Sequence, residues 1–358
     1  MKPRGQHASM LFDDPALFQQ AMLNDIAGAS SYIFLEFYRI GNDSVGERFR
    51  DLLMRKCKEG VKVKLLLDSW GTSLPESFFE QLIQFGGEVR YFKKIKFFID
   101  FFTKNHRRNH RKLLIIDDHI CYIGSANLTA YSMKWRESVL RVEGSLAQVF
   151  RKAFNDSAKI YRKYIFNKFA YKRTIFYRGF EIVQDLPSIY RQQIKKRYEK
   201  LLQNARKSVY IETPYFLPGY KLRRYMMQAA RRGVEVNVII PLHSDVRSVD
   251  LLRSKYMGFY YNSKIRIRFY TPGNLHAKCV LVDDETFAIG SANFDYRSFR
   301  YQHEIMLIGK DREIVSLLKG HIGKTLTDCI DFDYQAWLRR PVLEKVFGWM
   351  LIPFRHLF

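Results

Sequence analysis

The chain has 358 residues, enough to bury a large core and to form two domains of ordinary size. Lysine and arginine number 60 against 36 aspartate and glutamate residues, so the formal net charge is +24. This excess predicts a polyanionic partner, which is either nucleic acid or an anionic membrane surface. No run of 18 apolar residues occurs and the first residues lack an apolar core, so we expect neither a transmembrane helix nor a signal peptide.

Each half of the chain is predicted to begin with a helix and to continue into buried strands. The first helix is capped by Asp14, with Pro15 in its first turn and one apolar face made by Leu17, Ala21, Met22 and Ile26. A basic helix from Pro187 to Arg206 is expected to open the second half. Apolar runs at 63–67 and 236–240 each follow a helical segment and a glycine, which is typical of buried strands covered by helices. The pattern predicts an α/β fold.

A polar motif occurs twice with the same internal spacing. The first copy is His110-Arg-Lys112-Leu-Leu-Ile-Ile-Asp117, followed by Gly-Ser125-Ala-Asn127. The second copy is His276-Ala-Lys278-Cys-Val-Leu-Val-Asp283, followed by Gly-Ser291-Ala-Asn293. One copy alone is a weak signal, but a purely structural repeat would keep its apolar spacing and not the same polar residues. The duplication therefore predicts two equivalent lobes, 1–173 and 174–358, that share one site.

The strand pattern places these residues relative to one another. Alternation puts the histidine and lysine of each motif on one face of a strand, and the serine and asparagine end the next strand. The aspartates, Asp117 and Asp283, fall at strand ends before turns, where a role in pinning the turn is as reasonable as a chemical role. Glu137 and Glu304 end the two repeats and are candidates to orient the imidazoles.

Two histidines, each beside a lysine, suit the exchange of phosphodiester bonds without a metal. One neutral imidazole can attack phosphorus and form a phosphohistidine, and a second, protonated imidazole can donate a proton to the leaving alcohol. Lys112, Lys278, Asn127 and Asn293 would hold the nonbridging oxygens. No set of His, Asp or Glu shows metal-ligand spacing, and the four cysteines, of which Cys121 and Cys279 occur in apolar strands, show no zinc pattern. We expect no metal and no other cofactor. Three of the other histidines, His106, His119 and His303, are expected in loops or in solvent.

This constellation resembles the phospholipase D superfamily, whose signature is the duplicated His-x-Lys-x4-Asp motif. The segments Glu212-Thr-Pro-Tyr-Phe-Leu-Pro218, Gly290-Ser-Ala-Asn-Phe-Asp-Tyr-Arg-Ser298 and Trp135-Arg-Glu137 are most similar to those of bacterial cardiolipin synthases. The resemblance implies two phospholipase D-like lobes, each a mixed sheet flanked by helices, with the active site between them. It also implies that His110 is the nucleophile and His276 the acid and base, a choice that the symmetric sequence cannot make.

The nature of the phosphodiester is the open question, since lipid and nucleic acid both carry one. Residues 151–180 mix basic and aromatic residues, which suits single-stranded nucleic acid as well as a bilayer interface. Phenylalanines between lysines at 93–104 and the apolar stretch at 346–354 favour an anionic lipid surface, unless they are simply core. The prediction is a peripheral enzyme on the cytoplasmic side of a bacterial membrane that transfers a phosphatidyl group to phosphatidylglycerol. A phospholipase D hydrolase, a nuclease and a silent membrane-binding module are the alternatives.

Overall fold

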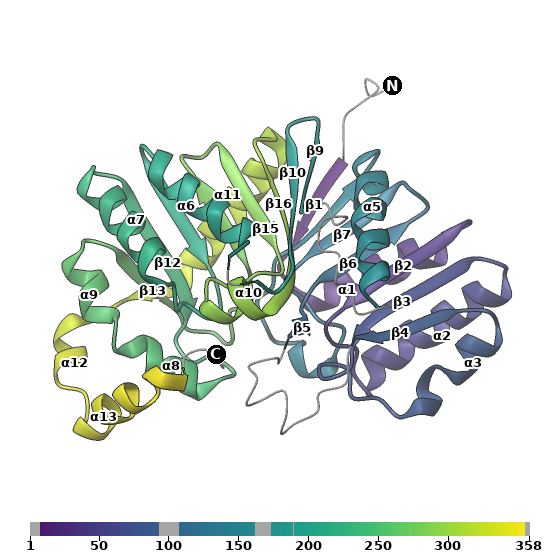
Figure 1. Cartoon of the computed structure of the whole chain (residues 1–358), viewed down its shortest axis with the longest axis horizontal. Helices are drawn as coiled ribbons and strands as arrows, with labels where there is room; N and C mark the ends of the chain where they lie inside the picture. Colours follow the sequence, from purple (N-terminus) through teal and green to yellow (C-terminus); the bar gives the residue numbers. More distant parts are fainter. Residues whose placement is uncertain (1–7, 93–106, 162–172, 189, 355–358) are drawn as a thin grey trace.

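The computed structural model describes residues 8–92, 107–161, 173–188 and 190–354, which form two α/β lobes side by side (Figure 1). The strands of the first sheet lie in the order β1-β8-β7-β6-β2-β3-β4. They are β1 (Ala8–Phe12), β2 (Tyr32–Phe37), β3 (Lys62–Asp68), β4 (Glu88–Phe92), β6 (Lys112–Ile116), β7 (Ile120–Gly124) and β8 (Val139–Glu143). The helices of this lobe are α1 (Pro15–Ala27), α2 (Ser44–Lys58), α3 (Glu80–Gln84) and α5 (Leu146–Ile160), with short 3-10 turns η1 (Glu76–Phe79) and η2 (Ala130–Ser132).

The strands of the second sheet lie in the order β17-β13-β12-β11-β14-β15-β16-β10-β9. They are β9 (Thr174–Tyr177), β10 (Phe180–Asp185), β11 (Ser208–Glu212), β12 (Glu235–Pro241), β13 (Arg266–Tyr270), β14 (Cys279–Val282), β15 (Thr286–Gly290), β16 (Gln302–Gly309) and β17 (Cys329–Asp331). The helices are α6 (Gln193–Asn204), α7 (Tyr220–Arg231), α8 (Arg247–Ser254), α9 (Met257–Asn262), α10 (Tyr296–Tyr301), α11 (Arg312–Thr327), α12 (Tyr334–Leu338) and α13 (Val342–Met350), followed by the 3-10 turn η4 (Ile352–Phe354).

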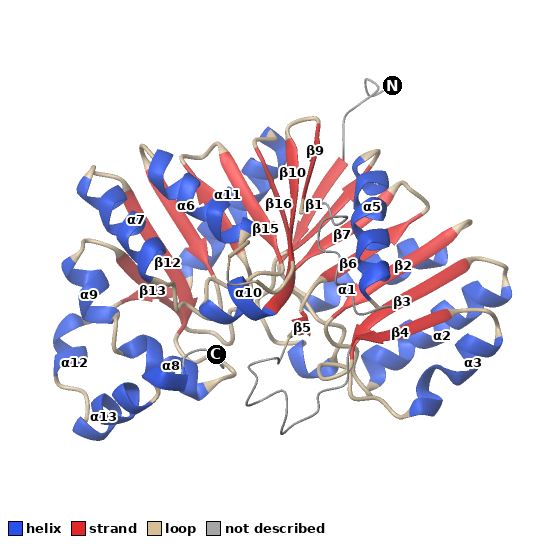
Figure 2. Ribbon diagram, in the orientation of Figure 1, coloured by secondary structure: helices blue, strands red, loops and turns tan. Residues whose placement is uncertain are grey.

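The two sheets repeat one topology, which confirms the predicted fold class. In the first lobe β2, β3 and β4 are parallel and β6 joins β2 antiparallel. In the second lobe β11, β12 and β13 are parallel and β14 joins β11 antiparallel. The mixed sheets with helices on their faces are visible in Figure 2. The first sheet ends at Glu143 and the strands of the second begin at Thr174, while the boundary at 173/174 stays a prediction.

A single apolar core joins the lobes. Helices α5 and α11 contribute Phe150, Phe154, Ile314 and Leu318 to a cluster that also contains side chains from both sheets, such as those of β6 and β14. Separate clusters lie under α1 and α2 in the first lobe and under α6 and α7 in the second. Because the central cluster is shared, the hydrophobic effect holds the two lobes in one arrangement.

Two sequence predictions about helices need correction. Helix α1 begins after Asp14 and buries Met22 and Ile26 as expected, but Leu17 is exposed and Phe18 is buried in its place. Helix α6 begins at Gln193 instead of near Pro187, because Asp185 accepts hydrogen bonds from the backbone N–H groups of Gln193 and Ile194. No helix in the described part of the chain combines the length and apolar character that a membrane span requires.

The glycine of each Gly-Ser-Ala-Asn segment allows two strands to approach closely. A Cβ atom on Gly124 would lie 2.2 Å from the carbonyl oxygen of Ser138, and one on Gly290 would lie 2.2 Å from that of Ile305. The same two carbonyls accept the backbone N–H groups of Ser125 and Ser291. The glycines therefore fix the positions of the serines that follow them.

We expect Gly290→Ala to lower the free energy of unfolding by about 1–3 kcal/mol, because backbone must move to admit the methyl group. The matched control is Gly323→Ala in α11, where nothing lies within 4 Å of the added carbon. That substitution should raise stability by about 0.4–1 kcal/mol, since alanine loses less backbone entropy in a helix. Urea unfolding of the three proteins measures both effects. Equal stabilities of the two variants would contradict the close approach.

Candidate active site at the lobe interface

Both motif histidines line one cavity between the lobes. The cavity has a volume of about 380 Å³, and its walls include His110 and Asn127 from the first lobe and His276 and Asn293 from the second. His110 lies two residues before β6, and His276 lies three residues before β14. The motifs therefore sit where equivalent strands begin, and the two lobes bring their strand ends together at one place.

Each histidine is held by the lobe that it does not belong to. His110 Nδ1 lies 3.0 Å from Glu304 Oε1, and His276 Nδ1 lies 2.9 Å from Glu137 Oε1. The backbone N–H of His110 donates to the carbonyl of His303, and that of His276 donates to the carbonyl of Arg136. Each histidine thus binds two consecutive residues of the opposite lobe, through its main chain and through its ring. Neither imidazole can reach this geometry unless the lobes are docked.

The motif serines hold the glutamates and do not line the cavity. The Ser125 hydroxyl donates to Glu137, and the Ser291 hydroxyl donates to Glu304. Ser125 and Ser291 are fully buried. Each His–Glu pair is therefore a chain of three residues, in which a serine of one lobe fixes a glutamate that fixes a histidine of the other. This orders the ring and leaves Nε2 for a substrate.

The motif lysines are buried beside the histidines. Lys112 Nζ donates to the carbonyl of His110 at 2.7 Å, and Lys278 Nζ donates to that of His276 at the same distance. Aromatic rings pack against the imidazoles: Tyr38 lies 5.1 Å from His110 and Trp135 lies 4.9 Å from His276, measured between ring centroids. The cationic groups are thus kept close to the rings in a site with little water.

Burial and mutual charge shift the pKa values of these groups. Burial, followed by the positive charges of Lys112 and Lys278, lowers the pKa of His110 well below its usual range. Burial lowers the pKa of Lys278 to about 8 and raises the pKa of Glu304 to about 8. Burial would raise the pKa of Glu137 too, but the nearby His276 ring lowers it on balance. The charge of Glu137 offsets only part of the cost of burying Lys278, and an anion bound beside the lysines would further favour their charged forms.

The sequence did not point to every residue of the cavity wall. Asn127 and Asn293 line it as predicted, together with Tyr38, Asp245, Asp295 and Arg297, among others. Asp295 and Arg297 lie in the segment that follows the second Gly-Ser-Ala-Asn, so their proximity to the motif was a usable signal. Tyr38 and Asp245 follow β2 and β12 in loops that carry no motif, and only the docking of strand ends brings them to the cavity.

Asp117 and Asp283 do not line the cavity, and their contacts fit the turn-pinning role, which is one of the two roles that the sequence left open. Both have positive φ angles, 50° and 56°, in the hairpin turns β6–β7 and β14–β15. The Asp117 carboxylate accepts hydrogen bonds from the backbone N–H groups of Ser30, Ser31 and Tyr32. The Asp283 carboxylate likewise accepts hydrogen bonds from the backbone N–H groups of Arg206, Lys207 and Ser208, where β11 begins. They tie each motif hairpin to the neighbouring strand at the end opposite the histidine.

The other histidines have mixed outcomes. His303 was expected in a loop or in solvent, and this is wrong: it is buried on β16, with its ring 5.0 Å from that of Phe92. His119 is exposed in a turn as predicted, where it pairs with Glu143. His106 lies outside the described residues, as does the lysine and phenylalanine segment at 93–104. The mixed segment at 151–180 is described except for 162–172.

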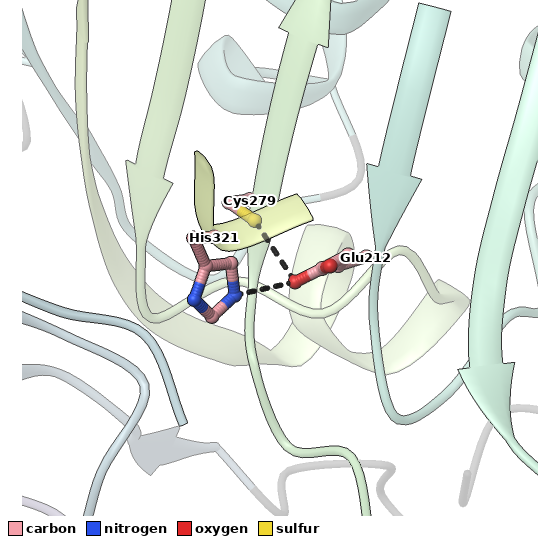
Figure 3. A group of neighbouring side chains, drawn as sticks. All are labelled: Glu212, Cys279 and His321. Atoms are coloured by element: carbon pink, nitrogen blue, oxygen red, sulfur yellow. Dashed lines mark hydrogen bonds and ion pairs between the residues drawn. The ribbon is translucent and has the colours of Figure 1, made fainter. Parts of the chain in front are cut away.

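A second buried polar cluster lies behind the second motif. Figure 3 shows Glu212 of β11, Cys279 of β14 and His321 of α11, whose ligand atoms lie within 4.8 Å of one another. His321 Nε2 is 2.8 Å and Cys279 Sγ 3.5 Å from one oxygen of Glu212, so both residues hydrogen-bond to the same carboxylate. The carbonyl of His321 accepts from Arg136, the residue before Glu137. The cluster thus supports the loop that carries the orienting glutamate of His276.

The comparisons with known proteins agree with this site. Residues 22–157 and 198–325 match the family described as "Cardiolipin synthase, PLD-like domain". The chain belongs to this family, which lies within the phospholipase D superfamily. It is therefore a phosphatidyltransferase.

Relatives extend this assignment to nearly the whole chain. The major cardiolipin synthase of Bacillus subtilis is 33% identical over 91% of this chain and 70% of its own length. The cardiolipin synthase of Listeria welshimeri is 34% identical over the same shares. Among solved structures, the phosphatidylserine synthase of Haemophilus influenzae has a TM-score of 0.74 at 15% identity, over 98% of this chain and 93% of that one. This last similarity concerns the fold alone.

Replacing Asp117 with alanine tests its position at the turn. The loss of its hydrogen bonds and the cost of alanine at positive φ should lower the free energy of unfolding by about 2–4 kcal/mol. Turnover by the folded protein should change by less than about threefold, since catalysis needs groups within hydrogen-bond reach of the reacting atoms. His110→Ala should show the opposite pattern, with stability kept and turnover lost. Loss of turnover at unchanged stability in the Asp117 variant would restore a chemical role.

Proposed function

We propose that the protein makes cardiolipin by transferring a phosphatidyl group to phosphatidylglycerol through a phosphohistidine at His110. The single observation that carries this proposal is the pair of imidazoles on one cavity, each oriented by a glutamate of the opposite lobe. Membership of the cardiolipin synthase family supports lipid over nucleic acid as the substrate. The assignment of His110 as nucleophile rests on the order of motifs in the superfamily.

The reaction has two displacements at one phosphorus atom. In the first, His110 Nε2 attacks phosphorus, the bond to the headgroup oxygen breaks, and the His276 ring donates its proton to the departing glycerol. In the second, the hydroxyl group of another phosphatidylglycerol gives its proton to His276 and attacks phosphorus. The phosphorus–nitrogen bond breaks, which releases cardiolipin and restores His110. Two phosphatidylglycerol molecules thus yield one cardiolipin and one glycerol.

The charged groups around the cavity have distinct tasks. Glu304 and Glu137 hold the imidazoles through Nδ1, and Glu137, whose pKa is lowered, stabilises positive charge on the His276 ring. The lysines Lys112 and Lys278 supply positive charge for the nonbridging oxygens, and the amides of Asn127 and Asn293 supply hydrogen bonds. These groups provide the charge that a divalent ion otherwise brings. We therefore propose that neither metal nor cofactor takes part and that a chelator leaves the rate unchanged.

The proposed place of action is the cytoplasmic face of a bacterial membrane, where the protein binds as a peripheral enzyme. The net charge of +24 favours a surface of anionic phospholipid. The relatives named cardiolipin synthase are bacterial proteins. In such a position the enzyme meets its donor and its acceptor in the same lipid layer.

The decisive experiment incubates the purified protein with phosphatidylglycerol vesicles and identifies the products by mass spectrometry. We expect cardiolipin and glycerol, and a rate lower by at least about 10²-fold for His110→Ala, because the nucleophile is gone. Phosphatidic acid in place of cardiolipin would indicate a hydrolase. Cleavage of an oligonucleotide without lipid turnover would indicate a nuclease, and either result would overturn the proposal.

Trapping the intermediate decides between the two histidines. After brief reaction with phosphorus-labelled phosphatidylglycerol and acid-free quenching, the label should be on the peptide that contains His110. His276→Ala should form the adduct more slowly and also release it slowly, because the first step then lacks its acid and the second step lacks its base. A label on the His276 peptide would reverse the roles while leaving the overall reaction intact.

The pH dependence follows from the charges of the free site. As the pH rises through about 8, Lys278 loses its positive charge and Glu304 gains a negative charge, because both have a pKa of about 8. Both changes weaken the binding of a phosphodiester anion. We therefore expect kcat/KM to fall above about pH 8, mainly through a higher KM. Kinetics with a short-chain phosphatidylglycerol dissolved as monomers, measured beside a melting curve at each pH, separate this effect from vesicle binding and from unfolding. A KM that stays constant to about pH 10 would count against it.

A further inference from the structure

Helix α13 turns its apolar side away from the protein. Six of its residues are apolar and between 47% and 72% exposed: Val342, Leu343, Val346, Phe347, Trp349 and Met350. At 3.6 residues per turn these six side chains fall within an arc of roughly 160°. A helix on the surface of a soluble domain normally buries such a face. Here the usual orientation is reversed.

Contacts on the other side of the helix fix this orientation. Gly348 is buried, and a Cβ atom there would lie 3.2 Å from the carbonyl oxygen of Leu251 in α8. Glu344 accepts a hydrogen bond from the hydroxyl of Ser254, also in α8. After the helix, Leu351 and Ile352 pack into a small apolar cluster with residues of α8. The polar and small residues hold α13 on the lobe, so its apolar face is presented outward.

Basic residues surround the exposed apolar face. Lys255 Nζ lies 3.5 Å from the ring centroid of Trp349, and the Arg340 guanidinium lies 3.9 Å from that of Trp337. Arg339 comes shortly before α13 in the sequence, and Lys345 within α13 donates to the carbonyl of Leu338. Apolar side chains that enter the acyl region while lysine and arginine stay among anionic headgroups are the pattern of a helix lying in a bilayer interface.

The helix is joined to the catalytic cavity through α8. Val246 and Val249, just before and within α8, line the cavity and belong to the same apolar cluster as Leu351 and Ile352. On the first lobe, Trp70 and Tyr131 line the cavity and are at least half exposed. Figure 1 shows α8 and α13 at the lower edge of the molecule, whereas the β9–β10 hairpin lies at the upper edge. A bilayer into which α13 inserted its apolar face would therefore lie next to the cavity.

We propose that α13 is the interfacial anchor that docks this enzyme on an anionic phospholipid bilayer with the cavity beside the lipid. The proposal rests on the proposed function, because the substrate then lies in the layer that α13 enters. The apolar arc lies in the interface, and the basic residues around it contact the headgroups. Docking delivers lipid to the cavity and leaves the chemistry of the histidines unchanged.

The test compares two double variants of the same composition. Leu343→Gln with Phe347→Gln changes the exposed face of α13, and Leu17→Gln with Phe176→Gln changes exposed residues of α1 and β9. Glutamine adds no charge, so electrostatic attraction is the same in all three proteins. We expect the α13 variant to bind phosphatidylglycerol vesicles at least about tenfold more weakly in a sedimentation assay, because two large apolar side chains no longer enter the interface. The control variant should bind like the unchanged protein.

Further measurements keep the two proposals distinguishable. Turnover of monomeric short-chain phosphatidylglycerol should be the same for both variants, and vesicles should protect the amides of 342–350 from hydrogen exchange. Equal vesicle binding by the two variants would overturn the anchor, as would a dimer in solution that the α13 variant dissociates. If the unchanged protein binds vesicles through α13 but turns over no lipid, the anchor stands and the proposed function fails.

Discussion

The whole site depends on the exchange of partners between the lobes. Each imidazole is oriented by a glutamate of the opposite lobe, and each of those glutamates is held by a serine of its own lobe. The main chain repeats the exchange, since β5 (Arg108–Asn109) pairs with β16 and Arg136 bridges to Leu275. An isolated lobe would contain a complete motif and only one member of each His–Glu pair. Duplication of the motif is therefore useful only because the lobes are docked face to face.

Docking of this precision requires a stiff interface, and the chain supplies it in two ways. The central apolar cluster packs α5 and α11 against both sheets, so relative movement of the lobes would open a large hydrophobic core. Arg136 adds polar contacts near the site, because its guanidinium binds Asp13, Thr325 and the carbonyl of His321. The neighbouring Glu137 is thereby tied to α11 of the other lobe. The position of Glu137 thus depends on contacts between Arg136 and α11 that lie outside the cavity wall.

The sequence predicted the parts of this arrangement that lie within one repeat. Equal spacing of His, Lys, Ser and Asn reports equal strand–turn–strand geometry, which is local and can be read from the order of residues. It could not show that Glu137 serves His276 and Glu304 serves His110, because both pairings exist only after the lobes meet. The sequence left two roles open for the aspartates for a related reason: their fixed spacing suits a turn with positive φ, which the structure shows, and would equally suit a chemical role. The apolar C-terminal stretch was visible, but which side of α13 faces the lobe depends on Gly348 and Glu344 meeting α8.

Burial sets the electrostatics of the cavity. Taking lysines, glutamates and histidines out of water is costly, and the shifts record that cost: burial lowers the pKa of Lys278 and of both histidines and raises that of Glu304. Glu137 and Glu304 offset part of this cost for Lys278, because their negative charge favours the charged lysine. Under the proposed function, a phosphodiester anion beside Lys112 and Lys278 would add negative charge and favour the cationic forms further. A neutral ligand of the same shape would add none, so the buried cations favour an anionic ligand over a neutral one.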